Sequence, residues 1–317
     1  MVKRSDEGKP VEKPRAVIVG GPTASGKSAA ALAIAREFDG VVINADSMQV
    51  YKELDILTAR PSRADEAAAP HKLYGVWPAS SQGTVGRWRT AALAEIKAAN
   101  KAGKLAVVCG GTGMYLKVLV EGLSRVPEIP SEVRNAARRR MGMVGRAAFF
   151  AELKKRDPVA GAKLARGDGQ RMLRAWEVLE ATGRSLYEFQ ADDPPSGDIW
   201  PTLVLLPPRE LQRQRLAARA LQMVEAGAVS EVRALLALEL PDTLPVMRAL
   251  GVRELAGYIR GEYDLDHGIN LMTVATQRFA KRQATWFKGQ MKAATFLNAQ
   301  YSESLMPRIR TFIKQIG

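Results

Sequence analysis

The chain has 317 residues and a hydrophobic content of 46%, and its 47 Lys and Arg outnumber 33 Asp and Glu to give a formal net charge of +14. This size predicts one large or two modest folded domains, and no apolar run approaches the roughly 18 residues that a membrane span needs. The single cysteine excludes an internal disulfide and fits a reducing cytoplasm, and two isolated histidines argue against a metal cage. So large a positive charge favours nucleic acid as partner, with solubility or attraction to an anionic membrane as alternatives.

The first segment, residues 1–14, is charged, contains two prolines and has no apolar stretch. We expect a disordered leader here rather than a secretory signal. The apolar run Ala16–Val19 follows and predicts a short buried strand, which begins the folded part of the chain.

A phosphate-binding loop is predicted directly after this strand. The pattern G-x-x-x-x-G-K-[ST] is matched by Gly21, Pro22, Thr23, Ala24, Ser25, Gly26, Lys27 and Ser28. The alanine-rich stretch Ala29–Phe38 predicts the helix that this pattern requires after it. Backbone N–H groups of such a loop point at an anion, Lys27 adds a charge, and the Ser28 hydroxyl can hold Mg²⁺. We therefore expect a pyrophosphate group to bind here.

Two further apolar runs, Val41–Ile43 and Leu105–Cys109, predict buried strands that alternate with helices, as in a parallel sheet. Asp46 follows the first of them, at the edge where open α/β sheets bind ligands, and is a metal-site acceptor, a general base or a helix N-cap. A second glycine loop, Gly110–Gly113, follows the other strand. Its glycines suggest close approach to a ligand, with a plain turn as the alternative.

The middle of the chain changes character. Ser131–Phe189 has a helical pattern throughout and ends in the breaker-rich linker Asp192–Gly197, after which Leu203–Leu206 predicts one more strand. We therefore expect an α/β core with a P-loop NTPase-like parallel sheet flanked by helices, formed by residues 15–123 and 200–317. Residues 124–199 are expected to be an all-helical insertion. From Arg209 onward we expect helices to the end of the chain.

Three helices combine positive charge with a pattern suited to RNA. Arg171 and Arg174 share one helix face and can pair with phosphate, or form an ordinary solvated face. Arg215 and Arg219 lie one turn apart after the last strand, as an anion clamp or a surface stripe. Residues 277–288 interleave cations with aromatic rings, which suits RNA but also suits rings packed in a core.

Taken together, these motifs resemble the bacterial tRNA dimethylallyltransferases, also called tRNA isopentenyltransferases. The blocks that carry the resemblance occur in the family's order and span nearly the whole chain: residues 21–28, 44–51, 110–115, 170–174 and 281–287. The resemblance implies an enzyme that moves a dimethylallyl group from its diphosphate to the exocyclic amine of the adenosine just 3′ of the tRNA anticodon. Pyrophosphate is released, the cofactor is Mg²⁺, and we expect a cytoplasmic monomer.

The resemblance also implies roles for single residues. Lys27 and Ser28, with Mg²⁺ and with Arg215 or Arg219, would stabilise the pyrophosphate, and Asp46 would be the general base. The helical insertion would close on the RNA. The residues that match tRNA contacts in the family are Asp46, Ser47, Met48, Gln49, Thr112, Arg134, Gln170, Arg171, Met172, Leu173, Arg174, Arg248, Arg253, Lys281, Arg282, Gln283, Thr285, Trp286 and Lys288.

Two other functions are compatible with parts of the pattern. A P-loop kinase of a small molecule or nucleoside would use the same loop but would bind ATP and release ADP. A regulator that binds RNA without catalysis would keep the charge but would not need Lys27, Ser28 and Asp46 together.

Overall fold

The computed structural model describes residues 15–165, 167–192 and 200–314; the predicted leader and residues 193–197 of the predicted linker lie outside these ranges. The chain divides into two compact units, Met1–Val120 with Asp198–Gly317, and Glu121–Gly197. We call the first the core unit and the second the insertion unit, and describe each by itself.

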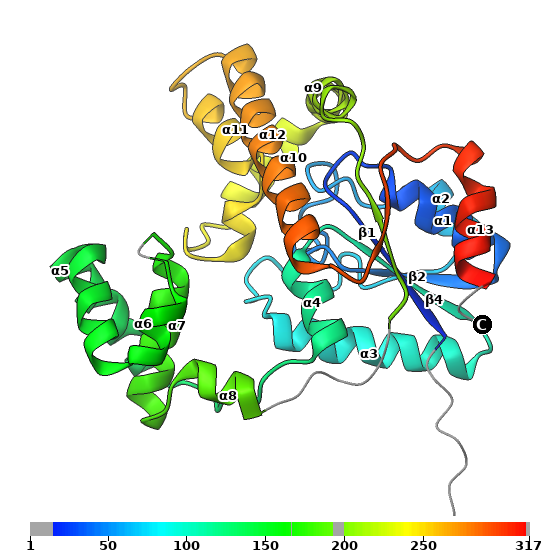
Figure 1. Cartoon of the computed structure of the whole chain (residues 1–317). Coiled ribbons are helices and arrows are strands. Elements are labelled where there is room, and N and C mark those ends of the chain that lie inside the picture. Colours follow the sequence, from blue (N-terminus) through cyan, green and yellow to red (C-terminus); the bar gives the residue numbers. More distant parts are fainter. Residues whose placement is uncertain (1–14, 166, 193–199, 315–317) are drawn as a thin grey trace, which may run out of the picture. The chain divides into compact units, whose positions relative to one another are not determined.

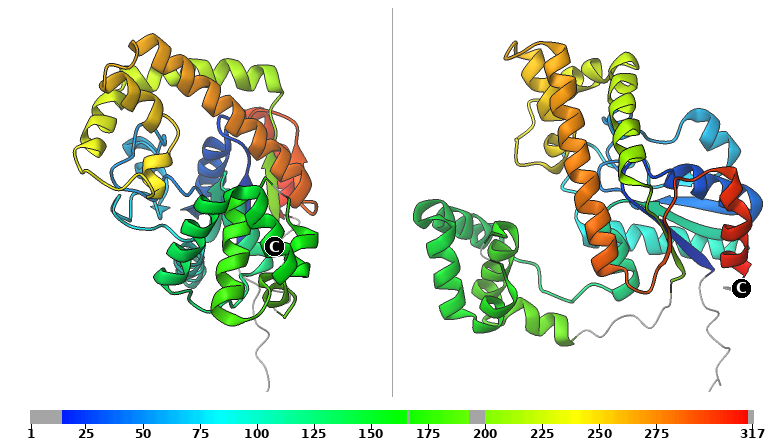
Figure 2. Two further views of the ribbon diagram at one scale, coloured as in Figure 1. Left: turned by 90° about the vertical axis from the view of Figure 1, so that its left-hand side faces the viewer. Right: turned by 45° about the horizontal axis from the view of Figure 1, so that its top comes forward.

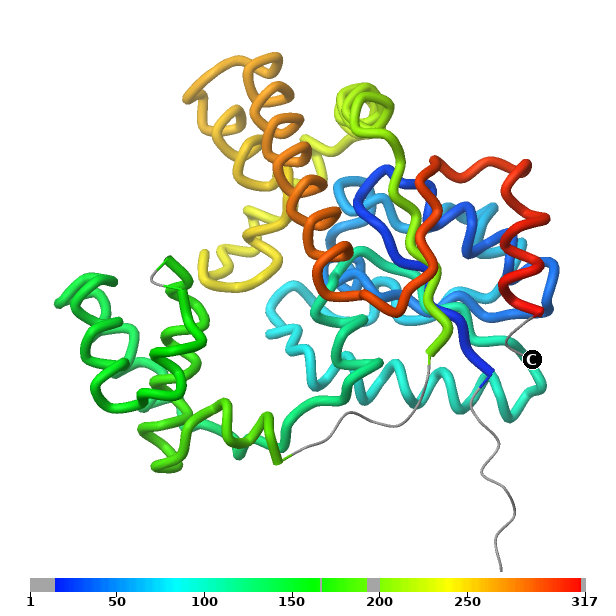
Figure 3. Tube along the Cα trace, viewed as in Figure 1, coloured from blue at the N-terminus to red at the C-terminus, as the bar shows by residue number. Residues whose placement is uncertain are grey.

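The core unit is built on a six-stranded sheet in which every described strand pair is parallel (Figures 1 and 3). The strand order is β3-β2-β4-β1-β5-β6. The strands are β1 (Ala16–Gly20), β2 (Gly40–Asn44), β3 (His71–Lys72), β4 (Leu105–Gly110), β5 (Thr202–Leu205) and β6 (Thr295–Leu297). Because parallel strands end at the same edge, the loops that follow β1, β2 and β4 meet there.

Helices cover both faces of this sheet, which explains why its strands are apolar along their whole length. Side chains of a strand alternate between faces. Val17 and Val19 pack with α1 (Lys27–Glu37) and α13 (Met306–Lys314). Ala16 and Ile18 belong to the core on the other side, with buried residues from the remaining helices of that face. These are α3 (Val85–Lys101), α4 (Gly113–Glu121) and α12 (Leu265–Gln290).

A helical layer stands at the carboxyl edge of the sheet, where α12 packs against α9 and α11 (Figures 1 and 2). Its elements are α9 (Arg209–Glu225), α10 (Ala228–Leu236), the 3₁₀ turn Pro245–Arg248 and α11 (Val252–Ile259); the short α2 (Arg63–Ala68) and the 3₁₀ turn Glu303–Leu305 complete the core unit. At about 1.5 Å per residue, the 26 residues of α12 span about 39 Å. This length lets one helix reach from the phosphate loop to α11.

The insertion unit is helical in its described part. Its elements are α5 (Ser131–Arg156), α6 (Pro158–Lys163), α7 (Gly169–Thr182) and α8 (Leu186–Asp192). Gly145, with a φ of 78°, breaks α5 into two helices. The small core of this unit includes Phe149, Leu153 and Met172, which are completely buried. The unit thus has an apolar centre of its own.

The predicted α/β fold with a flanked parallel sheet is confirmed, but two strands were missed. The expectation that the chain is helical from Arg209 to its end is wrong, because Thr295–Leu297 forms β6 and pairs with β5. β3, at the opposite edge, consists of His71 and Lys72. Strands of two and three residues are too short to show alternation in a sequence, so only pairing with a neighbour defines them.

Candidate active site

The phosphate loop follows β1 and leads into α1 as predicted. Gly26 caps the helix with a φ of 83°, and Gly21 leaves no room for a side chain, because a Cβ there would lie 2.7 Å from the Leu205 carbonyl oxygen. The loop is held from outside through Thr23. Its N–H donates to Gln283 Oε1 at 2.9 Å, and its carbonyl accepts from Gln212 Nε2 at 2.8 Å. Two buried amides thus hold the loop at Thr23.

One carboxylate and two cations lie beside this loop. Burial lowers the pKa of Lys27, repulsion from Arg219 lowers it further, and Cys109 and Asp46 act in the opposite direction. Burial also lowers the pKa of Arg219, and attraction to Asp46 offsets part of that effect. Lys27, Asp46 and Arg219 therefore form one electrostatic group. Arg215, the other candidate for the clamp, is exposed on α9.

Asp46 is positioned by hydrogen bonds from its own turn. Its Oδ1 accepts the N–H of Met48 at 2.9 Å, and its N–H donates to Asn44 Oδ1 at 2.7 Å. The Asn44 amide also donates to the carbonyls of Asp46 and Leu73, each at 3.0 Å. A turn, not a helix, follows Asp46, so the N-cap alternative is wrong. Within the described residues Oδ2 has no hydrogen-bond partner and can accept a proton.

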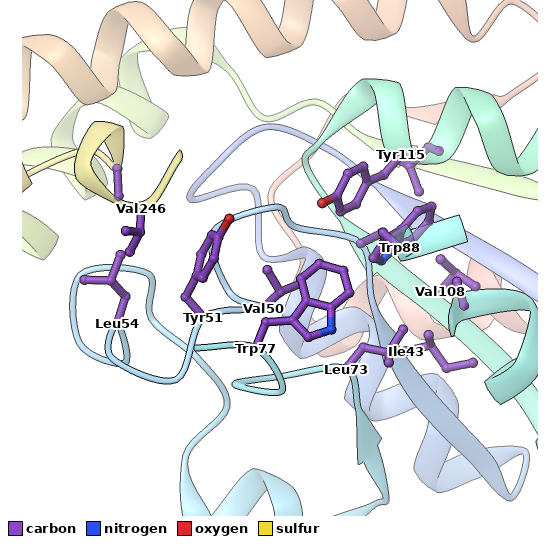
Figure 4. Close-up of a cluster of buried hydrophobic side chains, with 14 of the residues drawn as sticks. Ile43, Val50, Tyr51, Leu54, Leu73, Trp77, Trp88, Val108, Tyr115 and Val246 are labelled. Carbon is purple, nitrogen blue, oxygen red and sulfur yellow. The ribbon is translucent and has the colours of Figure 1, made fainter. Parts of the chain in front are cut away.

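Two buried aromatic side chains, Trp88 and Tyr115, connect this turn to the core. Trp88 Nε1 donates to the carbonyl of Asn44 at 2.8 Å, and the rings of Trp88 and Tyr115 stack with centroids 4.2 Å apart. Figure 4 shows both rings beside Ile43 and Val108 of the sheet. The residue that precedes the Asp46 turn is therefore hydrogen-bonded to a completely buried side chain of the core.

Protein groups pack closely against the second glycine loop. A Cβ at Gly110 would lie 2.1 Å from the carbonyl oxygen of Ala45, and one at Gly113 would lie 2.4 Å from the ring of Trp286. The Thr112 hydroxyl accepts the Ser47 N–H at 2.9 Å. These two glycines thus let Ala45 and helix α12 approach the loop, and the approach of a ligand to it stays a prediction. Thr112 itself connects this loop to the Asp46 turn.

Comparison with known proteins identifies the family. The family model of the IPP transferases matches residues 49–290. The chain belongs to this family. A tRNA dimethylallyltransferase of Paramagnetospirillum magneticum is 50% identical over 303 residues, 95% of this chain and 96% of that protein. One from Rhodospirillum rubrum is 48% identical, with 94% and 93% covered.

Solved structures of IPP transferase relatives agree with this fold. A tRNA isopentenylpyrophosphate transferase from Bacillus halodurans has a TM-score of 0.68 and 26% identity, and the match covers 96% of this chain and 98% of that one. A eukaryotic dimethylallyltransferase acting on tRNA has a TM-score of 0.78 and 26% identity, with 90% and 74% covered. The fold of this chain is thus shared with both of these solved structures.

Residues expected to contact tRNA occupy several places in the core unit. Ser47 and Met48 are half-buried in the Asp46 turn, and the Gln49 amide donates to the carbonyls of Thr58 and Ala59. The exposed members of this set are Arg248, Arg253, Lys281, Arg282, Thr285 and Lys288, whereas Trp286 is half-buried. The tRNA contact expected at Gln283 stays a prediction. In the structure this residue is 7% exposed, and both ends of its amide are used, toward Thr23 and Gly111.

In the insertion unit the expected contacts separate by exposure. Gln170 and Arg171 are exposed, whereas Arg134, Leu173 and Arg174 are half-buried. The side chain of Met172 is completely buried in the core of this unit, and its expected contact with tRNA stays a prediction.

Sequence reasoning missed a buried carboxylate that gathers some of these arginines. Burial raises the pKa of Glu177, while Arg174, Arg138 and Arg134 act in the opposite direction. Arg174 Nη1 lies 3.8 Å from Glu177 Oε2. The spacing of Glu177, three residues after Arg174 on one helix, was a signal for this pairing in the sequence.

Proposed function

We propose that this member of the IPP transferase family transfers the dimethylallyl group of dimethylallyl diphosphate to the exocyclic amine of the adenosine 3′ of a tRNA anticodon, and releases pyrophosphate. The observation that carries the proposal is the grouping of Lys27, Asp46 and Arg219 at the phosphate loop. The tRNA dimethylallyltransferases that are about half identical over nearly the whole chain support it.

The cations of the site would act on the leaving group. As the allylic carbon–oxygen bond breaks, its electron pair moves to the diphosphate, and negative charge grows there. Loop N–H groups, the Lys27 ammonium and the Arg219 guanidinium are fixed donors for that charge, and such preorganised donors lower the barrier. We assign this role to Arg219 rather than Arg215, because Arg219 is half-buried and interacts with Asp46 and Lys27, whereas Arg215 is exposed.

Asp46 would act on the attacking amine. The nitrogen forms a bond to the allylic carbon and must lose one proton. Asp46 Oδ2 is available to take it, because Oδ1 is held by the Met48 N–H. A carboxylate at hydrogen-bond distance from the amine both aligns it and accepts its proton. The turn that holds Asp46 also contains Ser47 and Met48, which would contact the adenosine.

Mg²⁺ fits the chemistry of the Ser28 hydroxyl. This ion binds through one or two protein oxygens together with phosphate oxygens, rather than in an all-protein cage. Among the described residues, no group of three His, Cys, Asp or Glu could hold a metal by itself. Bound beside Ser28, the ion would neutralise charge on the diphosphate.

Arginines of the insertion unit would hold the anticodon arm. Arg134, Arg171 and Arg174 can pair with phosphates, and Glu177 is placed to orient two of them.

No helix of the described residues could span a membrane. We further propose that the protein works in the cytoplasm as a monomer.

The test is incubation of the protein with labelled dimethylallyl diphosphate and unmodified tRNA, without ATP. We expect label in the tRNA and release of pyrophosphate. A P-loop kinase would instead need ATP and release ADP, and that result, with no label in the RNA, would overturn the proposal. RNA binding with no transfer would favour a regulator.

A further inference from the structure

A basic groove lies between α9 and α12, next to the phosphate loop. Its volume is about 660 Å³, and Pro22, Pro207 and Pro208 contribute to its lining. The cationic side chains along it are Arg209, Arg213, Arg278, Lys281 and Lys288. No acidic residue lines it, and in the described part of the chain none of these five cations has an ion-pair partner. Unpaired positive charge in a concave surface attracts an anion.

This groove does not include the charged group formed by Lys27, Asp46 and Arg219. Gln212 and Gln283 reach Thr23 from α9 and α12, and their hydrogen bonds to its carbonyl and N–H form a bridge between the two helices. Gln212 of this bridge lines the groove, as does Pro22 of the loop. The cations of the groove are thus a second set, distinct from Lys27 and Arg219.

The size of the charged surface indicates a polymer. From Arg278 to Lys288 the cations extend over ten residues of α12, or about 15 Å at 1.5 Å per residue. Three residues of the groove, Arg278, Lys281 and Thr285, also line a hollow of about 520 Å³ on α12. Arg282 and the half-buried ring of Trp286 complete that hollow. Charges that follow a backbone beside a ring that can stack a base are typical of surfaces for single-stranded nucleic acid.

We propose that the α9–α12 groove binds the sugar-phosphate backbone of the RNA substrate, so that the RNA is held by α9 as well as by α12. The inference rests on the proposed function for the identity of the RNA. It adds Arg209 and Arg213, neither of which belongs to the expected tRNA contacts, as phosphate-binding residues. Both side chains are exposed and lie one helical turn apart, facing the cations of α12 across the groove.

The test is the double variant Arg209→Ala/Arg213→Ala, compared with Arg233→Ala. Arg233 is an exposed arginine of α10 that does not line the groove and has no ion pair within the described residues. Binding of unmodified tRNA is measured without dimethylallyl diphosphate over a range of salt concentrations. Turnover is then measured with saturating tRNA.

We expect the double variant to bind tRNA about tenfold more weakly. The slope of log affinity against log salt concentration should be smaller by about one to two, because the variant makes two fewer phosphate contacts and therefore releases fewer counterions on binding. The Arg233→Ala variant should match the parent protein. Turnover at saturating tRNA and the KM for dimethylallyl diphosphate should stay unchanged in both variants.

Two results would overturn the inference. Unchanged tRNA affinity in the double variant would remove the RNA from the groove. A higher KM for dimethylallyl diphosphate with unchanged tRNA affinity would assign the groove to the diphosphate. RNA binding is measured without the diphosphate, so it does not depend on prenyl transfer. If the double variant binds tRNA more weakly but the parent protein transfers no prenyl group, the proposed function is contradicted and the RNA-binding groove is not.

Discussion

At the scale of single residues, the candidate site depends on how each charge is held. Asp46 has one carboxylate oxygen fixed by a backbone N–H and the other without a partner among the described residues. Asn44, completely buried, holds both the N–H and the carbonyl of Asp46. A carboxylate fixed in this way loses little freedom when it meets the amine, which favours its role as a base.

The Asp46→Asn variant should therefore keep the turn and lose the proton acceptor. Its amide oxygen can still accept the Met48 N–H, so we expect tRNA affinity within about twofold of the parent. The rate of transfer in a single turnover should fall by about 10²–10⁴. A fall of less than tenfold in that assay would reduce Asp46 to a positioning role.

Lys27 supports a prediction that includes its dependence on pH. The Lys27→Ala variant should lower the transfer rate by about 10²–10³, the loss typical for one preorganised donor, while tRNA binding stays intact. In the parent, burial lowers the pKa of Lys27 below the usual 10.5. As pH rises through that lowered value the ammonium loses its charge. The value of kcat/KM for dimethylallyl diphosphate should therefore begin to fall with rising pH before the pH reaches 10.5. A profile that stays flat to pH 10.5, or full activity of the variant, would contradict the assignment.

At the scale of elements, close packing between loops and helices decides the geometry of the site. The phosphate loop, the Asp46 turn and the second glycine loop each follow a different parallel strand, and α12 presses on two of them. Gln283 contacts both Thr23 and Gly111 from this helix. One long helix thus sets the distance between the two loops.

Gly113→Ala tests this packing. The added Cβ would lie 2.4 Å from the Trp286 ring, so the ring and α12 would have to shift. Overpacking of this kind costs about 1–3 kcal/mol of unfolding free energy. Gly289→Ala is the control. Gly289 lies in α12, as Trp286 does, and a Cβ there would meet nothing within 4 Å. The temperature of thermal unfolding should be lowered in Gly113→Ala and not in Gly289→Ala. Equal stability of the two variants would mean that Trp286 moves freely.

At the scale of the whole molecule, the sequence predicted the parallel sheet, the phosphate loop and the position of Asp46, because these depend on local patterns of strand, loop and helix. It could not predict which protein groups would approach the glycines of the second loop. Gly110 and Gly113 accommodate Ala45 and Trp286, which are distant in sequence. The groove between α9 and α12 was hidden for the same reason, since its cations come from two helices that only the fold brings together.

The division into two units leads to a prediction about stability. The insertion unit has a core of seven buried residues, whereas both faces of the sheet in the core unit are covered by larger apolar clusters. A small core buries less apolar surface, so its local opening should cost less free energy than opening of the sheet. Amide hydrogen exchange of the full protein without tRNA should therefore be faster in α5 and α7 than in β1 and β4.

Binding of tRNA gives this measurement a second arm. If arginines of the insertion unit hold the RNA, saturating tRNA should slow exchange in α5 and α7, because a ligand that binds only the folded form stabilises it. Helix α13, on the opposite side of the sheet from α12, serves as the internal control and should not change. Equal exchange in both units without tRNA would refute the difference in stability, and no slowing on addition of tRNA would remove the insertion unit from the RNA interface.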